Sequence, residues 1–167
     1  GSRNLAVNGT RRDALYSAGR LIVDCPMLSV ETSVRDALSS DGGVAVVKGM
    51  LKINATKDAI KSKRGNVLFL GGSSQLTSVG QKGDGVQAAN IYMYDGYVSV
   101  KTQGDASRGF NAKGSVYIID GSLAVLTEGN VTFSPKKADY SSNSCVKCGK
   151  SMYMAGGYLN LENRATA

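Results

Sequence analysis

The chain has 167 residues, of which 42% are hydrophobic and 20% are charged, so it can form a domain with a core and is not a disordered segment. It contains no histidine, which argues against a catalytic triad with a histidine base and against histidine-based metal chemistry. Its net charge of +7 favours a polyanionic partner. Because long runs of Lys or Arg and long apolar stretches are both missing, the sequence predicts neither a nucleic-acid partner nor a transmembrane segment.

The sequence is interpreted as one domain from residue 3 to residue 167, with a loop insertion at residues 131–143. Gly1 and Ser2 are interpreted as an expression scar that follows the removal of a native leader. The 21 glycines and only 2 prolines suit many tight turns between short strands.

In chain order, one pattern occurs six times: a small residue, a large apolar residue, any residue, and then Ser, Ala or Cys. Its occurrences are residues 14–17, 37–40, 59–62, 85–88, 109–112 and 145–148. Each is followed by a short apolar strand, at residues 21–23, 44–46, 67–69, 91–93, 116–118 and 152–154. A Gly-containing turn and a further apolar strand then complete the repeat. A period in the low twenties predicts an all-β fold, a single-stranded right-handed parallel β-helix of about six coils.

Alternation within the strands predicts three inward rows of apolar side chains, stacked from coil to coil. The rows are Leu15, Leu38, Ile60, Val86, Phe110 and Val146; Val23, Val46, Phe69, Met93, Ile118 and Met154; and Val30, Ile53, Val100, Val125 and Leu161. Both ends of the chain match the same phase of the coil. We therefore expect open coil ends that meet another chain or continue in a longer protein.

Two outward rows are predicted beside these. The first is Ile22, Ala45, Leu68, Tyr92, Tyr117 and Tyr153, and the second is Asp24, Val47, Leu70, Tyr94, Ile119 and Ala155. An exposed aromatic column can stack against sugar rings, contact a protein, or simply pack along the surface. The apolar second row favours an interface, such as that of a homo-oligomer.

The charged residues predict two further features. Lys61, Lys63, Arg108 and Lys113 could form a positive strip that holds carboxylated or sulfated sugars, and the alternative is scattered solvated side chains. A row of Asp13, Asp36, Asp58 and Asp84 ends where Arg108 takes its place. These carboxylates either cap turns through their own backbone or contribute to a calcium site. The CxxC at 145–148 is interpreted as structural, either as buried thiols or as a local disulfide, because the zinc and redox contexts are missing.

Three segments, 36–38, 58–62 and 83–88, each followed by a Gly-bounded apolar strand, resemble a bacterial family. It is the polysaccharide-lyase-like carbohydrate-binding domain family, and the resemblance covers roughly residues 4–163. It implies a right-handed parallel β-helix at the bacterial cell surface or secreted, which binds acidic or cellulosic glycans, with calcium as a ligand. The break of the Asp row at Arg108 departs from that pattern.

The leading hypothesis is a non-catalytic extracellular module for acidic polysaccharide. Alternatives are a structural or cell-adhesion stalk that engages protein or itself, and a polysaccharide lyase. No cofactor is required, and calcium is an optional ligand. The candidate carbohydrate-binding residues are Tyr92, Tyr94, Tyr117, Tyr153, Lys61, Lys63, Arg108 and Lys113, and the candidate metal ligands are Asp36, Asp58 and Asp84.

Overall fold

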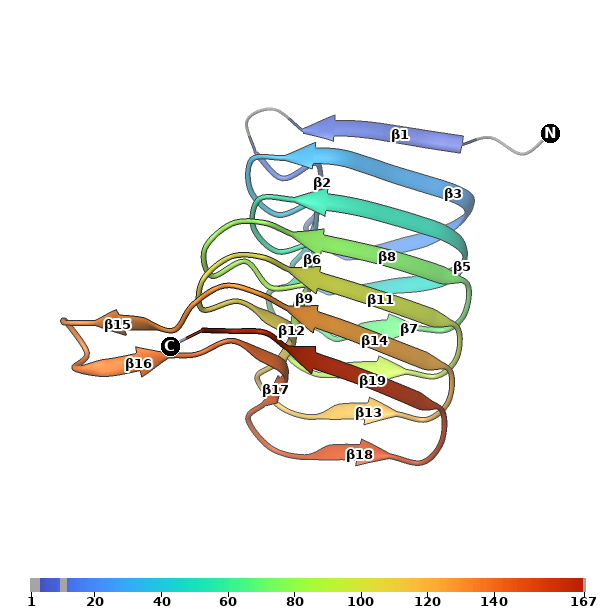
Figure 1. Ribbon diagram of the computed structural model, residues 1–167. Helices are drawn as coiled ribbons and strands as arrows, with labels where there is room; N and C mark the ends of the chain where they lie inside the picture. The colour runs from blue at the N-terminus through green and yellow to red at the C-terminus, as the bar shows by residue number, and fades with distance from the viewer. Residues whose placement is uncertain (1–3, 10–11, 167) are drawn as a thin grey trace.

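A computed structural model describes residues 4–9 and 12–166, and these residues form strands and turns without any helix (Figure 1). The interpretation of Gly1 and Ser2 falls outside the described residues. The strands are β1 (Asn4–Gly9), β2 (Leu15–Ser17), β3 (Arg20–Ser33), β4 (Leu38–Ser40), β5 (Gly43–Ala55), β6 (Ile60–Ser62), β7 (Val67–Phe69), β8 (Ser73–Ser78), β9 (Val86–Ala88), β10 (Ile91–Met93), β11 (Tyr97–Thr102), β12 (Arg108–Ala112), β13 (Val116–Ile118), β14 (Ser122–Thr127), β15 (Thr132–Ser134), β16 (Asp139–Ser141), β17 (Ser144–Cys148), β18 (Met152–Met154) and β19 (Tyr158–Asn163).

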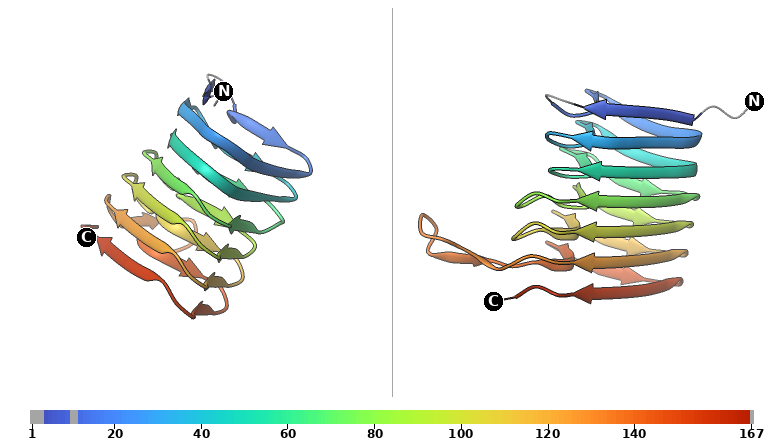
Figure 2. Two further views of the ribbon diagram at one scale, coloured as in Figure 1. Left: turned by 90° about the vertical axis from the view of Figure 1, so that its right-hand side faces the viewer. Right: turned by 45° about the horizontal axis from the view of Figure 1, so that its top comes forward.

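The strands stack into a right-handed parallel β-helix with three faces, as predicted (Figures 1 and 2). Face 1 is the six-stranded sheet β17-β12-β9-β6-β4-β2. Face 2 contains the first halves of β3 and β5, followed by β7, β10, β13 and β18. Face 3 contains β1, the second halves of β3 and β5, and then β8, β11, β14 and β19. Each coil runs through faces 3, 1 and 2 in that order.

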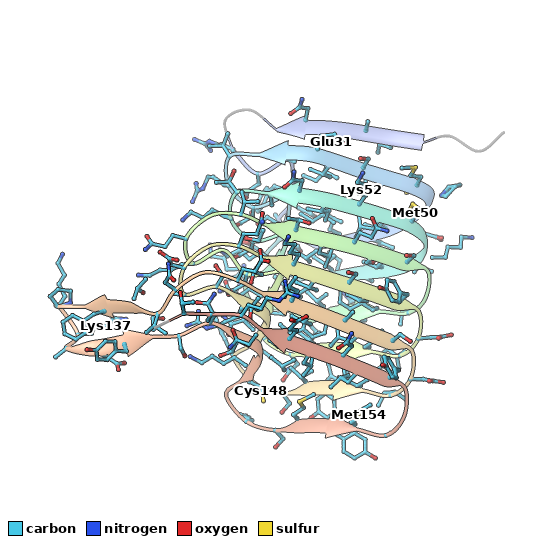
Figure 3. The ribbon with its side chains drawn as sticks, viewed as in Figure 1. Glu31, Met50, Lys52, Lys137, Cys148 and Met154 are labelled. Carbon is cyan, nitrogen blue, oxygen red and sulfur yellow. The ribbon has the colours of Figure 1, made fainter. Side chains whose placement is uncertain are left out.

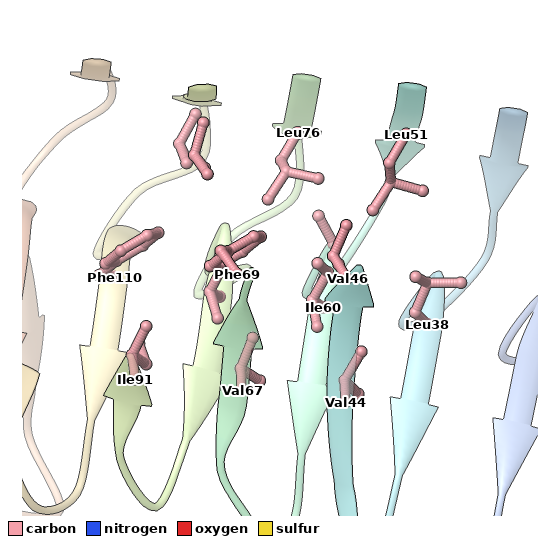
Figure 4. Packing of buried hydrophobic residues seen from close by; sticks show 14 of the residues in the cluster. Leu38, Val44, Val46, Leu51, Ile60, Val67, Phe69, Leu76, Ile91 and Phe110 are labelled. Carbon is pink, nitrogen blue, oxygen red and sulfur yellow. The ribbon is translucent and has the colours of Figure 1, made fainter. Parts of the chain in front are cut away.

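The register confirms the three inward rows. Each predicted neighbour on faces 1 and 2 is paired with the corresponding residue of the next coil. On face 3, Val7 and Leu76 also belong to the third row, which the sequence prediction left incomplete there. The central members of the rows are fully buried (Figure 4). Burying one such side chain contributes about 1.5–3 kcal/mol, so the stack itself is the source of stability.

One glycine position of the repeat closes the corner between faces 2 and 3. Gly49, Gly72, Gly96, Gly121 and Gly157 occupy it in successive coils, all with φ between +76° and +94°. That backbone conformation suits glycine because a Cβ would clash with the backbone. A Cβ on Gly72 would lie 2.5 Å from the carbonyl oxygen of Gly49 in the coil above. The corner therefore lets the coils approach at strand spacing.

The insertion at 131–143 forms an antiparallel hairpin, β15–β16, that projects from the side of the helix (Figures 1 and 2). Its turn is closed by the N–H of Lys137, which donates to the carbonyl of Ser134. At its base, the buried Asn143 side chain accepts the N–H of Ala106 at 2.9 Å and donates to the carbonyl of Glu128. These contacts fix the position of the hairpin on the coil.

The second outward row needs one correction. Val47, Leu70, Tyr94, Ile119 and Ala155 follow each other from coil to coil. Asp24 does not join them, because a register irregularity after Val23 pairs Asp24 with Lys48 instead. The Lys48 ammonium lies 3.5 Å from the Asp24 carboxylate. Aligning the repeats of this chain with one another could not detect that irregularity.

Candidate functional site

The predicted tyrosine column exists on face 2. Tyr92, Tyr117 and Tyr153 are paired in register, and Tyr94 lies on the same strand edge as Tyr92. The rings of Tyr92 and Tyr117 stack at a centroid distance of 4.7 Å and an interplanar angle of 9°. Tyr92 and Tyr94 are also nearly parallel, with centroids 6.0 Å apart. The rings therefore cover each other along the helix axis.

This stacking changes what the column can offer to a sugar. A sugar ring stacks on an open aromatic face, and one face of Tyr92 and one face of Tyr117 are covered by the other ring. Tyr153 is 55% exposed and tilted by 54° from Tyr117, so it is the column member that presents most ring surface. Each stacked aromatic pair of the column contributes packing of about 0.5–1.5 kcal/mol.

The aspartate row forms a hydrogen-bonded ladder at the corner where face 3 leads into face 1. The Asp36 carboxylate accepts the N–H of Asp58 at 3.1 Å, and the Asp58 carboxylate accepts the N–H of Asp84 at 2.8 Å. The Asp84 carboxylate accepts the N–H of Arg108 at 2.9 Å. These carboxylates do cap backbone N–H groups, as one of the two alternatives predicted. Each of them, however, caps an N–H group of the next coil and not one of its own turn.

The other oxygens of this ladder face positive or amide groups. The Lys61 ammonium lies 3.2 Å from Asp36 and 2.9 Å from Asp58, while the Asn111 amide donates to Asp84 at 2.6 Å. Burial raises the pKa of all three carboxyls, and the N–H and cationic contacts only partly offset it. Burial also lowers the pKa of Lys61, but the charges of Asp58 and Asp36 outweigh it and leave that pKa raised. Lys61 is therefore held as a cation between the carboxylates of Asp36 and Asp58.

Beside the ladder lie two adjoining cavities, which we call the basic track. The first, of about 240 Å³, is lined by Arg35, Asp36, Lys57, Asp58, Lys61, Lys82 and Gln87. The second, of about 290 Å³, is lined by Lys82, Arg108, Ser134, Lys137, Asp139, Tyr140, Ser141, Ser142 and Lys147. Lys82 lines both, so the cavities lie next to each other along the same corner of successive coils.

Arg108 is the most enclosed cation of the track. Its side chain is 15% exposed, its Nη2 donates to the Ser141 hydroxyl at 3.1 Å, and its Nη1 lies 3.9 Å from Asp84. The Nε of Arg108 is buried without a hydrogen-bond partner among the described residues. A buried donor without a partner is costly, so Arg108 is held in this position at a cost in free energy.

The whole chain, residues 1–167, matches a family described as carbohydrate-binding domain-containing protein. The chain belongs to this family. No curated protein and no solved structure matches it. The membership supports a carbohydrate as the partner, while the narrower polysaccharide-lyase-like relationship stays a prediction. In the part of the chain that the structure describes, no helix could span a membrane.

The structure brings only some of the predicted residues of this carbohydrate-binding domain together. Lys61 and Arg108 line the basic track. Lys63 and Lys113 lie at the other end of the face 1 strands, where the Lys113 ammonium donates to the carbonyl of Lys63 at 3.4 Å. The four tyrosines form a separate surface on face 2. The predicted set is therefore three surfaces and not one site.

Sequence reasoning missed several residues of the track. Arg35, Lys57 and Lys137 line the track but are absent from the predicted carbohydrate-binding residues. For Arg35 and Lys57, the available signal was a basic residue directly before Asp36 and before Asp58, at the same phase of successive coils. Since side chains at equal phase stack at about 4.8 Å, this repetition could have indicated a basic edge.

Calcium stays a prediction for the carbohydrate-binding domain. Among residues 4–9 and 12–166, no three acidic, Cys or His side chains gather as metal ligands need to. Both carboxylate oxygens of Asp36, Asp58 and Asp84 already contact Lys61, an amide or a backbone N–H group. A calcium ion would have to displace those contacts to obtain its six to eight oxygen ligands.

The three cysteines are free thiols, and burial raises the pKa of Cys145. Because the thiolate is the reactive species, we expect one slow thiol when the native protein is titrated with an aromatic disulfide at pH 7.5. The Cys145→Ser variant should lose the slow phase, and Cys148→Ser (Figure 3) should keep it. A Cys145–Cys148 disulfide detected by mass spectrometry would contradict this assignment.

Proposed function

We propose that this domain is a non-catalytic extracellular module, secreted or at the bacterial cell surface, that binds acidic polysaccharide along the basic track. The observation that carries the proposal is the pair of neighbouring cavities that share Lys82 and are also lined by Arg35, Lys57, Arg108, Lys137 and Lys147. A polyanion needs such a row of cations on a rigid surface. The resemblance and this class of ligand support the extracellular location.

The dimensions of the track suit a polymer. Arg35 lies in the second coil and Lys147 in the sixth, so the track spans four coil steps of about 4.8 Å, or about 19 Å. Each exposed cation contributes only about 0.2–1 kcal/mol, because solvent and salt screen it. Several in a row on a preorganised β-helix give useful affinity without a deep pocket.

Isothermal titration calorimetry with polygalacturonate tests the proposal. We expect saturable binding that weakens as NaCl rises from 50 to 500 mM, and no binding to neutral galactan. The Arg35→Gln/Lys57→Gln variant should bind roughly three- to tenfold more weakly, since two screened contacts are removed. Binding should be the same in EDTA and in calcium. Absence of binding to every acidic polymer tried would overturn the proposal.

The tyrosine column supplies the matched control. Tyr92→Ala/Tyr117→Ala should change the affinity for polygalacturonate by less than twofold, because these rings cover one another and lie on face 2. If that variant abolishes binding while Arg35→Gln/Lys57→Gln does not, the column and not the track is the glycan site. Incubation with polygalacturonate should release no unsaturated product that absorbs in the ultraviolet. Such a product would show a lyase.

A stalk or adhesion role is the second candidate. The observation that favours it is the exposure of apolar side chains on face 2, where Ile22, Leu70, Tyr94, Ile119 and Tyr153 are all at least 37% exposed. Analytical ultracentrifugation tests self-association through this face. The Ile22→Ser/Ile119→Ser variant should then shift the protein towards monomer, and a wild type that is monomeric at high concentration would exclude self-association.

A further inference from the structure

The hairpin β15–β16 stands out because it is inserted directly before Ser144, the residue that follows Arg108 in the former aspartate row. The hairpin contributes Ser134, Lys137, Asp139, Tyr140 and Ser141 to the lining of the second cavity of the basic track. Lys137 is placed on the hairpin turn, away from the stacked coils (Figure 3). The second cavity, called the recess below, is therefore bordered by the hairpin as well as by the coils, whereas only coil residues line the first.

The charge in this recess is strongly unbalanced. Four cationic side chains, Lys82, Arg108, Lys137 and Lys147, line it together with one carboxylate, that of Asp139, for a net of +3. The Asp139 carboxylate accepts the N–H of Tyr140 at 2.8 Å. Three serine hydroxyls in the same lining add hydrogen-bond donors.

Arg108 is the side chain of the recess that can orient a bound carboxylate. Asp84 is its nearest carboxylate, but the Asp84 oxygens already accept the N–H of Arg108 and the Asn111 amide. The Ser141 hydroxyl fixes one end of the guanidinium. A planar carboxylate is the group that an Arg fork binds best, in a bidentate manner.

The hairpin that borders the recess carries an aromatic pair. Phe133 and Tyr140 are directly opposite each other in the hairpin, with ring centroids 4.9 Å apart and an angle of 51°. They are 52% and 70% exposed, and Tyr140 also lines the recess. Exposed rings beside an anion site offer the apolar face that a sugar ring stacks against.

From these contacts we infer that the recess between the hairpin and β12 is the specificity subsite of the track. It takes the carboxylate of one uronic acid unit on Arg108 and Lys137, while Tyr140 stacks against that sugar or its neighbour. The inference rests on the proposed function and deepens it. The first cavity then holds the rest of the polymer through charge alone.

The test uses a matched pair of ligands, trigalacturonate and its fully methyl-esterified form, titrated into the full chain. Wild type should bind the acid at least tenfold more tightly than the ester. Arg108→Gln and, independently, the exposed Lys137→Gln should reduce that ratio to about threefold or less. Tyr140→Ala should weaken both ligands several-fold and preserve the ratio. Arg64→Gln, whose side chain pairs with Asp41 outside the recess, is the control and should change neither.

Two results separate this inference from the proposed function. If polygalacturonate binds but the acid and the ester bind equally well, or if Lys137→Gln and Arg108→Gln both keep the ratio, the subsite is wrong and the track stands. If a sulfated oligosaccharide shows the Arg108 dependence and trigalacturonate does not, the carboxylate assignment is wrong. If polygalacturonate itself does not bind, the proposed function fails.

Discussion

Phe110→Ala is expected to lower the free energy of unfolding by about 3–5 kcal/mol. Phe110 is fully buried in the face 1 row, and its ring stacks on Phe69 of face 2 at a centroid distance of 5.9 Å and an angle of 1°. Truncation would leave a cavity between two stacked coils, and the neighbouring backbone is held by strand pairing on both sides. The loss is a large share of the roughly 5–15 kcal/mol that a typical domain has.

Urea denaturation followed by circular dichroism measures this change, and Phe133→Ala is the matched control. Phe133 has the same side chain but is exposed on the hairpin, so its truncation should cost less than about 1 kcal/mol. Equal losses for the two variants would show that the interior of the coil is not tightly packed at Phe110.

Asp58→Ala is expected to destabilise the fold by about 1–3 kcal/mol, because it leaves the N–H of Asp84 buried without an acceptor. It also takes from Lys61 the nearer of its two carboxylates. Asp58→Asn is the matched variant, since the amide oxygen can still accept that N–H. The Asp58→Asn variant should therefore lose less stability than the Asp58→Ala variant in urea denaturation at pH 7.

The wild type and the Asp58→Asn variant also differ in their expected pH dependence. Burial raises the pKa of Asp58 above 3.8, so the folded protein holds this proton more tightly than the unfolded chain. The contribution of Asp58 to stability is then fully present below pH 3.8 and is lost as pH rises through the folded pKa. The amide of the Asp58→Asn variant does not titrate, so the stability of this variant relative to wild type should increase from pH 3.5 to pH 7. A relative stability that decreases over this range would contradict the raised pKa.

The sequence predicted the coil stack well because identical phases stack at a fixed spacing. Leu15, Leu38 and Ile60 indicated the core row by recurring at 23 and 22 residues, and the structure pairs them. Leu76 was missed because its strand, β8, is otherwise polar and lacks the apolar alternation of its neighbours. Asp24 was misplaced because a strand irregularity leaves no compositional trace.

The candidate site was less predictable for a physical reason. Which backbone N–H group an aspartate caps depends on how successive coils are offset from each other. The Asp58 carboxylate, for example, accepts the N–H of Asp84, which lies 26 residues later in the chain. The recess depends on a still longer reach, because Lys82 and Lys147 line one cavity across three coils and a hairpin. The period of the repeat predicts which row a residue belongs to, but it does not predict where an inserted segment packs against the coils.

The hairpin has a consequence for how such a domain can diversify. No residue of the segment 132–141 is buried, and it joins the coil through the anchored Asn143. The coils close on one another at a constant pitch whether or not a corner carries extra chain. Ligand preference could then be exchanged by grafting different hairpins at this corner, with the thermal stability of the scaffold left nearly constant.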